Sequence, residues 1–441
     1  MSLPAELVVA GPRPLRGRIR LPGDKGISHR ALLFGALADG QSRVRGIADG
    51  DDVQRTRAAL EQLGVRVRVD GADLVVHGTG ARFREPEAVI DCGNSGTTMR
   101  TLAGLISAHS FHCVLTGDAS LTSRPMARVV EPLRALGATI DGRDDGARAP
   151  LSIRGGSLRG TRCELAVASG QVKTALVLAG LQAEETTEIA EPRPSRDHTE
   201  RMLDALGAPI ERVDELTLRV HRGPVAAFEL DVPGDPSSAA FFAVAATITR
   251  GSSIVLEHVS LNPTRVGFVD VLRRMGANLE VRATGETLGE PVGDLVVTAA
   301  DLTGTAIVPE EGWIDEIPAL AVAAAFAAGT TEISDAAELR VKESDRIGTL
   351  EQELAQLGVA VEARPDGLVI RGGQPRAASL KSHGDHRIAM AAAVAAIACD
   401  GDSTVRGWSA VTSSYPGFAA DLDRLTDGAE ADRSETNGSE A

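Results

Sequence analysis

Apolar and polar residues alternate along this chain in short segments that predict an α/β fold. Strand-like alternation over residues 17–21 stops at Pro22-Gly23, and residues 31–38 form an apolar run typical of a buried helix. The polar residues between these segments therefore fall in a turn that enters a helix. Backbone N–H groups at a helix start, together with the helix dipole, favour an anion. Lys25 and Arg30 are accordingly expected to face an anionic ligand.

One helix-ending pattern recurs along the chain. Leu-x-x-[Leu/Met]-Gly-[Ala/Val] ends at residues 65, 138, 208, 277 and 359. Each copy predicts a helix that ends at a glycine and continues into a strand, and a second strand-like run follows each copy. The copies lie too far apart for a solenoid, so each belongs to a larger repeated unit.

A polar turn followed by an Ala-rich apolar helix is the second repeated feature. The turns begin near residues 23, 93, 168, 234, 314 and 383. Together the two patterns predict six units of strand, turn, helix, strand, helix and strand, the sixth completed by the first strands of the chain. Six units suggest two domains of three, with the polar helix starts gathered at one end of each domain. Asp24 and Asp235 fit N-cap positions, and Ser28 and His29 are also expected to act as helix-start caps.

Composition narrows the class of protein. The 441 residues are enough for two sizeable domains, and only 3% are aromatic, so Ala, Val, Leu and Ile must form the core. No apolar run reaches the roughly 18 residues of a membrane span, and residues 1–6 lack signal-peptide features, so a cytoplasmic protein without a membrane partner is expected. The net charge of −15 argues against nucleic acid as a partner. The four cysteines have neither disulfide nor zinc spacing.

Lysine is rare in this chain. Of the 46 basic residues only Lys25, Lys173, Lys342 and Lys381 are lysines. A position that keeps lysine in an arginine-rich chain indicates a need for a compact ammonium or an amine that can lose its proton. Three of the four lie in polar motifs, whereas Lys381 is expected at the surface.

The polar turns and loops carry cations, hydrogen-bond donors and a few carboxylates. This set suits two small polyanions, because arginine forks bind carboxylate or phosphate and carboxyl groups can transfer protons. No turn has Walker A or GxGxxG spacing, so a nucleotide is not implied. The residues are Thr97, Arg100, Arg124, Ser169, Gln171, Lys173, Arg196, Asp315, Lys342, Glu343, Arg346, Asp385, His386 and Arg387.

Eight motifs, in order along the chain, resemble those of the 5-enolpyruvylshikimate-3-phosphate synthases in the enolpyruvyl transferase family. The resemblance runs from about residue 15 to residue 420. The motifs are Gly-Asp-Lys-x-Ile-Ser-His-Arg (23–30), Gly-Asn-Ser-Gly-Thr-Thr-x-Arg (93–100), Ser-Arg-Pro-Met (123–126), Ser-x-Gln-Val-Lys (169–173), Ser-Arg-Asp-His-Thr-Glu-Arg-Met (195–202), Gly-Asp-Pro-Ser-Ser-Ala-Ala (234–240), Leu-Arg-Val-Lys-Glu-Ser-Asp-Arg (339–346) and Gly-Asp-His-Arg (384–387).

The resemblance implies an α/β fold of two similar domains, each a threefold repeat of βαβαββ units in an inside-out, barrel-like arrangement, closing over an inter-domain cleft. One domain would comprise residues 1–21 and 236–426, the other residues 22–235, and the acidic residues 427–441 would form a disordered tail. The implied reaction transfers the enolpyruvyl group of phosphoenolpyruvate to the 5-hydroxyl of shikimate 3-phosphate in the shikimate pathway. It implies no metal and no organic cofactor. Nothing in the sequence suggests an obligate oligomer, so a monomer is expected.

The resemblance also assigns roles to individual residues. Lys25, Asp315 and Glu343 would be catalytic. Phosphoenolpyruvate would be bound by Lys25, Gly96, Arg124, Gln171, Arg346, His386 and Arg387. Shikimate 3-phosphate would be bound by Lys25, Gly26, Arg30, Ser169, Gly170, Gln171, Arg196, Asp315 and Lys342.

This sequence departs from the pattern of the family at three places. The family usually has serine at Gly26 and serine or alanine at Gly170, and some members have a lysine shortly before Tyr415-Pro416. Two alternative functions are kept open. One is transfer to an amino-sugar nucleotide, whose enzymes carry a catalytic cysteine in the loop that here holds Arg124; the nearest thiol here is Cys113, which argues against this alternative. The other is a non-catalytic binding module on the same fold.

Overall fold

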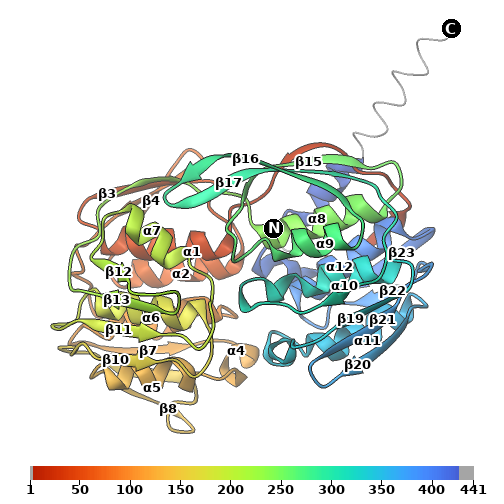
Figure 1. Ribbon diagram of the computed structural model, residues 1–441. Helices are drawn as coiled ribbons and strands as arrows, with labels where there is room; N and C mark the ends of the chain where they lie inside the picture. The colour runs from red at the N-terminus through yellow and green to blue at the C-terminus, as the bar shows by residue number, and fades with distance from the viewer. Residues whose placement is uncertain (1–2, 427–441) are drawn as a thin grey trace. The chain divides into compact units, whose positions relative to one another are not determined.

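A computed structural model describes residues 3–426 of the chain (Figure 1). The chain divides into two compact units. Unit 1 comprises the chain up to Pro22, Pro233–Gly285 and the chain from Pro291, and unit 2 comprises Gly23–Val232 and Glu286–Glu290. The tail expected at residues 427–441 lies outside the described residues.

The unit boundaries differ from the expected ones at the two chain crossings. Pro22 and residues 233–235 belong to unit 1. Backbone hydrogen bonds account for this, because Asp235 N–H donates to Pro22 O at 3.0 Å and Gly234 N–H donates to His258 O at 2.7 Å. The segment Glu286–Glu290 was expected in the first domain but groups with unit 2.

Unit 2 contains three modules, each combining one buried helix, one or two further helices and a sheet. The first holds α1 (Lys25–Leu37), β3 (Gln41–Arg45), α2 (Asp51–Gln62), β4 (Arg66–Asp70), β5 (Asp73–His77) and β14 (Glu229–Asp231). The second holds β6 (Ile90–Asp91), α3 (Gly96–Ile106), β7 (His112–Thr116), α4 (Ala119–Ser123), α5 (Ala127–Ala135), β8 (Thr139–Arg143) and β9 (Arg148–Arg154). The third holds β10 (Arg162–Glu164), α6 (Gly170–Gly180), β11 (Thr187–Ala190), α7 (His198–Ala205), β12 (Ile210–Arg212) and β13 (Thr217–Val220).

Unit 1 repeats this plan. Its first module holds β2 (Arg16–Arg20), α8 (Pro236–Ile248), β15 (Ser253–Ser260), α9 (Gly267–Arg274), β16 (Asn278–Thr287) and β17 (Glu290–Thr298). The second holds β18 (Ala306–Ile307), η1 (Glu311–Glu316), α10 (Ile317–Phe326), β19 (Thr330–Ile333), η2 (Ala337–Val341), α11 (Arg346–Gln356), β20 (Ala360–Arg364) and β21 (Gly367–Arg371). The third holds β22 (Ser379–Lys381), α12 (His386–Ala398), β23 (Gly401–Arg406), η3 (Trp408–Ser413) and β1 (Glu6–Gly11) from the start of the chain.

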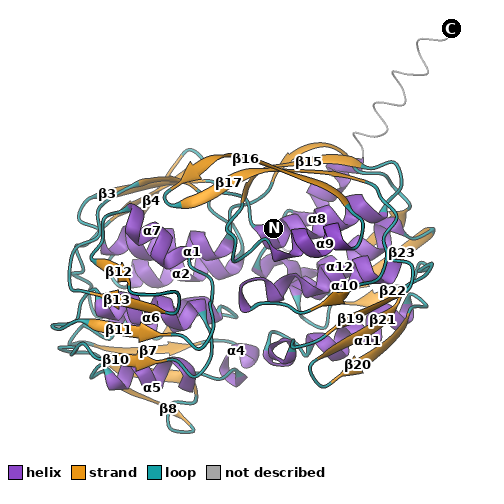
Figure 2. Cartoon of the chain, in the orientation of Figure 1, coloured by secondary structure: helices purple, strands orange, loops and turns teal. Residues whose placement is uncertain are grey.

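The described strands form six sheets with related topology (Figure 2). In four of them the strand that enters a buried helix lies parallel to the strand that leaves it, as in β6–β7, β10–β11, β18–β19 and β22–β23. In the other two sheets, the strand parallel to the one that leaves the buried helix comes from the far side of a chain crossing. β14 lies parallel to β3, and β2 lies parallel to β15. Strand β1 pairs antiparallel with β23, which confirms that the chain start completes the sixth unit.

The recurring glycines end helices as predicted. Gly64, Gly137, Gly207, Gly276 and Gly358 all have positive φ, between 64° and 105°. After each glycine the next N–H donates to the carbonyl five residues back, for example Val65 N–H to Leu60 O at 3.0 Å. This is the Schellman arrangement, in which a residue without Cβ reverses the chain into the following strand.

Each unit has its own apolar core, and six helices are buried on nearly all sides: α1, α3 and α6 in unit 2, and α8, α10 and α12 in unit 1. Such helices contact several neighbours at once. Within unit 2, α3 and α6 pack at Gly104. No helix among the described residues is long and apolar enough to cross a membrane.

Asp24 and Asp235 cap the helices that follow them, as expected. Asp24 accepts from Ile27 N–H and Asp235 accepts from Ser237 N–H, both at 2.8 Å. The capping role expected for Ser28 and His29 is wrong, because both lie inside α1 and their side chains bond elsewhere. Ser28 Oγ accepts from Ala48 N–H, and His29 Nδ1 contacts Thr56 Oγ1 at 2.7 Å.

The close approach of α3 and α6 predicts that Gly104→Ala destabilises the protein. A Cβ at Gly104 would lie 2.6 Å from Ala175 Cα and overlap the carbonyl group of Ala175. Because neither backbone can move independently, we expect a loss of about 1–3 kcal/mol in the free energy of unfolding. Gly156→Ala is the control, since a Cβ there meets nothing within 4 Å. Equal urea midpoints for the two variants would contradict this packing.

Candidate active site

The start of α1 presents Lys25 in unit 2. Lys25 follows the Asp24 cap directly, and its Nζ forms an ion pair with Asp52 in the first turn of α2. The Lys25 side chain keeps 22% of its surface exposed. Lys25 is therefore anchored by a carboxylate and still accessible to a ligand.

Arg30, one turn further along α1, links two helix starts. Its guanidinium donates to the backbone oxygens of Gly26 at 2.9 Å and Gly170 at 3.2 Å. It also donates to the hydroxyls of Thr174 and Thr199, each at 2.7 Å. Burial lowers the pKa of Arg30 to about 10, so the group stays charged near pH 7. Arg30 fixes the start of α6 relative to α1 and adds positive charge there.

The start of α3 is lined by two arginines. Arg124 donates to Asn94 Oδ1 at 2.6 Å and to Ser120 Oγ at 3.1 Å, and Arg100 donates to Gln171 Oε1 at 2.6 Å. A Cβ at Gly96 would lie 2.8 Å from Arg100 Nη1 and 3.5 Å from Arg124 Nη1. The absence of a side chain at Gly96 thus keeps the space in front of both guanidinium groups open.

Ser169, Gly170 and Arg196 lie together at the start of α6. Ser169 is the N-cap residue and accepts from Val172 N–H. A Cβ at Gly170 would lie 3.2 Å from Arg196 Cβ, so the loop carrying Arg196 packs directly against this helix start. A helix N-terminus beside an arginine is a suitable site for a phosphate group.

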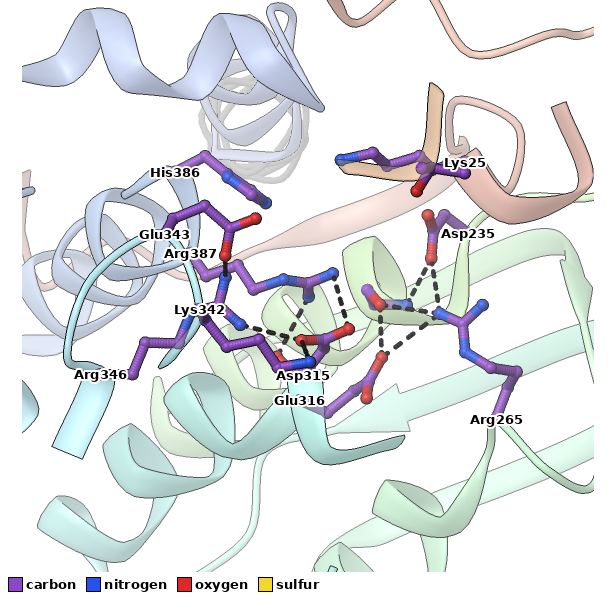
Figure 3. A network of polar contacts seen from close by, with 12 residues as sticks. Lys25, Asp235, Arg265, Asp315, Glu316, Lys342, Glu343, Arg346, His386 and Arg387 are labelled. Carbon is purple, nitrogen blue, oxygen red and sulfur yellow. Dashed lines mark hydrogen bonds and ion pairs between the residues drawn. The ribbon is translucent and has the colours of Figure 1, made fainter. Parts of the chain in front are cut away.

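In unit 1, Arg346 joins three carboxylates, of which Figure 3 labels Asp315 and Glu343. Its guanidinium donates to Asp385 at 2.8 Å, Asp315 at 2.9 Å and Glu343 at 2.5 Å, and its side chain is only 1% exposed. Burial alone would lower the pKa of Arg346, but the charges of the three carboxylates outweigh it and raise the pKa. Arg346 is therefore a permanent cation at the centre of this cluster.

Asp315 contacts three cations. Besides Arg346, Lys342 Nζ lies 3.6 Å from Asp315 Oδ1, and Arg387 Nη2 lies 3.9 Å from Asp315 Oδ2. Arg387 also donates to the backbone oxygen of Asp315 at 3.1 Å (Figure 3). Asp315 is thus a carboxylate held among three cations.

Asp385 caps α12 and accepts a hydrogen bond from Arg346 in the protein interior. It accepts from Arg387 N–H at 2.9 Å, and its side chain is fully buried. Burial alone would raise the pKa of Asp385, but the charge and hydrogen bond of Arg346 and the charge of His386 together outweigh burial and hold the pKa below its ordinary value. His386, the next residue, is 3% exposed, and its Nδ1 lies 3.9 Å from Asp385 Oδ1.

Arg265 and Glu316 form a second buried charge cluster in unit 1 that sequence reasoning did not find. Arg265 donates to Ser237 Oγ at 2.8 Å, and Arg265 Nη2 lies 3.2 Å from Asp235 Oδ1 and 3.4 Å from Glu316 Oε1 (Figure 3). Glu316 is fully buried and directly follows Asp315. The cluster therefore attaches the end of η1 to the start of α8.

The structure groups the predicted site residues within each unit. In unit 2, Lys25, Gly26, Arg30, Gly96, Arg124, Ser169, Gly170, Gln171 and Arg196 all lie at or beside the starts of α1, α3 and α6. In unit 1, Asp315, Lys342, Glu343, Arg346, His386 and Arg387 lie around the starts of α10, α11 and α12.

Sequence reasoning also missed Glu191 and Glu200, the partners of Lys173. Glu200 lies inside a motif, and its charge in an otherwise buried turn is a usable signal.

The thiols do not have the properties of a catalytic cysteine. All four cysteines are buried and unpaired. Burial raises the pKa of Cys113 to about 12, so its reactive thiolate form is scarce near neutral pH. Cys113 thus does not have the properties of the catalytic cysteine that the amino-sugar alternative requires.

The fold and these residues define a class of enzymes that act on small phosphorylated or carboxylated anions. Buried helix starts lined with lysine and arginine bind small phosphorylated or carboxylated anions, and ionised carboxylates beside them can transfer protons. Solved structures with this fold include an EPSP synthase from Acinetobacter baumannii, with a TM-score of 0.85, 40% identity, and coverage of 95% of this chain and 98% of that one. An enolpyruvyl transferase from Streptomyces tendae, at 19% identity and a TM-score of 0.78, shares the fold.

Sequence comparison identifies the family within this class. The family described as EPSP synthase (3-phosphoshikimate 1-carboxyvinyltransferase) matches residues 9–422. A relative named 3-phosphoshikimate 1-carboxyvinyltransferase from Thermus thermophilus is 51% identical over 93% of this chain and 97% of its own length. One of the same name from a Synechococcus species is 50% identical over 96% of this chain and 97% of its own length. The chain belongs to the EPSP synthase family.

The Arg346 cluster predicts a pH-dependent contribution of Asp385 to stability. Because the pKa of Asp385 is lowered in the folded state, its stabilisation is present above its ordinary pKa of 3.8 and disappears as the pH falls through the folded value. We expect Asp385→Asn to cost about 2 kcal/mol near pH 7, measured by urea unfolding. The cost should begin to shrink as the pH falls below 3.8.

Asp400→Asn is the matched control for this prediction, because Asp400 is an exposed aspartate of the same unit. Its effect on the urea midpoint should be small at every pH. A cost of Asp385→Asn that does not shrink as the pH falls below 3.8 would contradict the proposed charge pairing.

Proposed function

We propose that this chain is a 3-phosphoshikimate 1-carboxyvinyltransferase, which transfers the enolpyruvyl group of phosphoenolpyruvate to the 5-hydroxyl of shikimate 3-phosphate and releases phosphate. The observation that supports it most is the Asp315 carboxylate among Lys342, Arg346 and Arg387. This arrangement combines a proton acceptor with cations for anionic substrates. Membership of the EPSP synthase family supports the same acceptor.

Phosphoenolpyruvate carries a phosphate and a carboxylate, and the proposed ligands provide arginine forks for both. In unit 2 these are Arg124 with Gln171 and the backbone at Gly96, where a missing Cβ leaves room. In unit 1 they are Arg346, Arg387 and His386. Lys25 would touch both substrates. Arginine–carboxylate and arginine–phosphate pairs can be bidentate, so they orient the substrate as well as hold it.

Shikimate 3-phosphate would be bound by Ser169, Arg196 and Lys342, with Arg30 in a supporting role. The Arg30 guanidinium already donates to four protein oxygens, so its contribution is to hold the backbones of Gly26 and Gly170 in place and to add positive charge. A serine Cβ at Gly26 would approach Asp24 Oδ1 to 3.1 Å, closer than ordinary van der Waals contact. Glycine thus fits the local packing at this position.

The proposed chemistry is addition followed by elimination. Asp315 accepts the proton of the C5 hydroxyl of shikimate 3-phosphate, and the hydroxyl oxygen forms a bond to C2 of phosphoenolpyruvate. At the same time C3 of phosphoenolpyruvate gains a proton from Lys25 or Glu343. The tetrahedral adduct then loses phosphate from C2 and a proton from C3, which restores the double bond. Positioning by fixed charges provides most of the rate enhancement, because the arginines and lysines are held by the protein before the substrates bind.

The acceptor is tested by measuring phosphate release from phosphoenolpyruvate with purified protein. We expect turnover with shikimate 3-phosphate and none with an amino-sugar nucleotide, because Arg124 stands where the enzymes of that reaction carry a cysteine. Turnover only with the amino-sugar nucleotide would contradict the proposed acceptor. Binding of both substrates without phosphate release would indicate the non-catalytic module.

Lys25→Arg tests the proton-transfer role of Lys25. Arginine keeps the positive charge but does not release a proton in this pH range, so we expect kcat to fall about 100-fold. Substrate binding should change less, because the charge remains. Lys381→Arg is the control, since Lys381 is exposed on β22 in unit 1. Unchanged kcat in Lys25→Arg would remove Lys25 from the proton-transfer step.

A further inference from the structure

Lys173 is the rare lysine whose role neither the motifs nor the proposed mechanism explains. It lies in the first turn of α6, two residues after Gln171, and its side chain is 4% exposed. Its Nζ contacts Glu191 Oε2 at 2.6 Å and Glu200 Oε1 at 2.7 Å. Both carboxylates are almost completely buried as well, with exposed fractions of 5% and 9%.

The two partners of Lys173 enclose the loop that carries Arg196. Glu191 precedes this loop and Glu200 lies in α7, which follows it. Within the loop, Ser195 Oγ donates to Glu191 Oε1. Lys173 therefore holds the loop from both sides, and Ser195 connects the same carboxylate to the residue next to Arg196.

The loop is held against the start of α6. The ideal Cβ position at Gly170 lies 3.2 Å from Arg196 Cβ and 3.3 Å from Arg196 O. A small outward shift of the loop would separate Arg196 from the Ser169–Gly170 helix start. Together these two features form the phosphate-binding geometry, so that geometry depends on the contacts that hold the loop.

The charge balance explains why the contact is strong and why lysine occupies this position. Burial would lower the pKa of Lys173, but the charges of Glu200 and Glu191 outweigh burial and raise it. Burial raises the pKa of Glu191, and a single ammonium offsets this only in part because it serves two carboxylates. A compact ammonium can approach both carboxylates within 2.7 Å, whereas a planar guanidinium has a different geometry and volume.

We propose that Lys173 is a positioning residue for the 3-phosphate of the acceptor: it holds Arg196 against the start of α6 through Glu191 and Glu200. The proposal rests on the proposed function, since it deepens the binding of the same acceptor. It concerns one substrate, so its loss affects shikimate 3-phosphate and leaves phosphoenolpyruvate binding and the chemical step intact.

The test compares Lys173→Met and Ser195→Ala with the wild type in steady-state kinetics. We expect the KM for shikimate 3-phosphate to rise about tenfold in Lys173→Met and about threefold in Ser195→Ala. The KM for phosphoenolpyruvate and kcat should stay within about twofold of the wild type. Lys381→Met is the matched control, because it removes an exposed lysine of unit 1.

A double-mutant cycle separates positioning from general destabilisation. In an Arg196→Met background, Lys173→Met should raise the KM for shikimate 3-phosphate by less than about twofold, since the residue it positions is already gone. Additive effects of the two substitutions, or equal changes in both KM values, would overturn the proposal. Ser195→Ala keeps the three buried charges, so it decides the question if Lys173→Met does not fold.

Wild-type turnover distinguishes this proposal from the proposed function. If the wild type turns over shikimate 3-phosphate and Ser195→Ala and Lys173→Met leave its KM unchanged, the role of Lys173 is wrong and the transferase function stands. If the wild type shows no turnover with this acceptor, the proposed function fails, and the role of Lys173 fails with it.

Discussion

The candidate site in unit 1 depends on the contacts of the buried Arg346 guanidinium with three carboxylates. The guanidinium binds Asp315 at the end of η1, Glu343 before α11 and Asp385 at the start of α12, and so fixes three separate segments. A buried charge without partners is very unfavourable, so each of these segments is held where its carboxylate is needed. The same contacts place Asp315 beside Lys342 and Arg387. Structural support and proposed chemistry therefore depend on one residue.

Unit 2 uses buried cations in the same way, but with different partners. Arg30 binds mainly backbone carbonyls and threonine hydroxyls and joins the starts of α1 and α6. Lys173 binds two carboxylates and fixes the loop that carries Arg196. In both units the helix starts are positioned by cations that bind protein groups. Residues closer to the surface, such as Lys25, then remain accessible to substrates.

The fold was predictable from the sequence because its signals are local. Gly64 and its four counterparts end helices through contacts within six residues, and Asp24 and Asp235 cap the helices that follow them. The candidate site residues lie in the repeated turns and the loops near them, where the motifs predict them. The contacts of Lys173 with Glu191 and of Arg265 with Glu316 join distant segments, which no local pattern records, although the charge of Glu200 within a motif is a usable signal. The position of residues 286–290 depends on tertiary contacts in the same way, because Glu290 Oε1 lies 2.7 Å from His198 Nδ1.

The central claim is that this protein adds the acceptor hydroxyl to phosphoenolpyruvate and then eliminates phosphate. The most direct measurement is the deuterium content of the product vinyl methylene after turnover in D2O, read by NMR. Protonation of C3 makes a transient methyl group, so the account predicts deuterium in the product methylene of enolpyruvyl shikimate 3-phosphate. A product formed with no deuterium at this carbon would contradict the account.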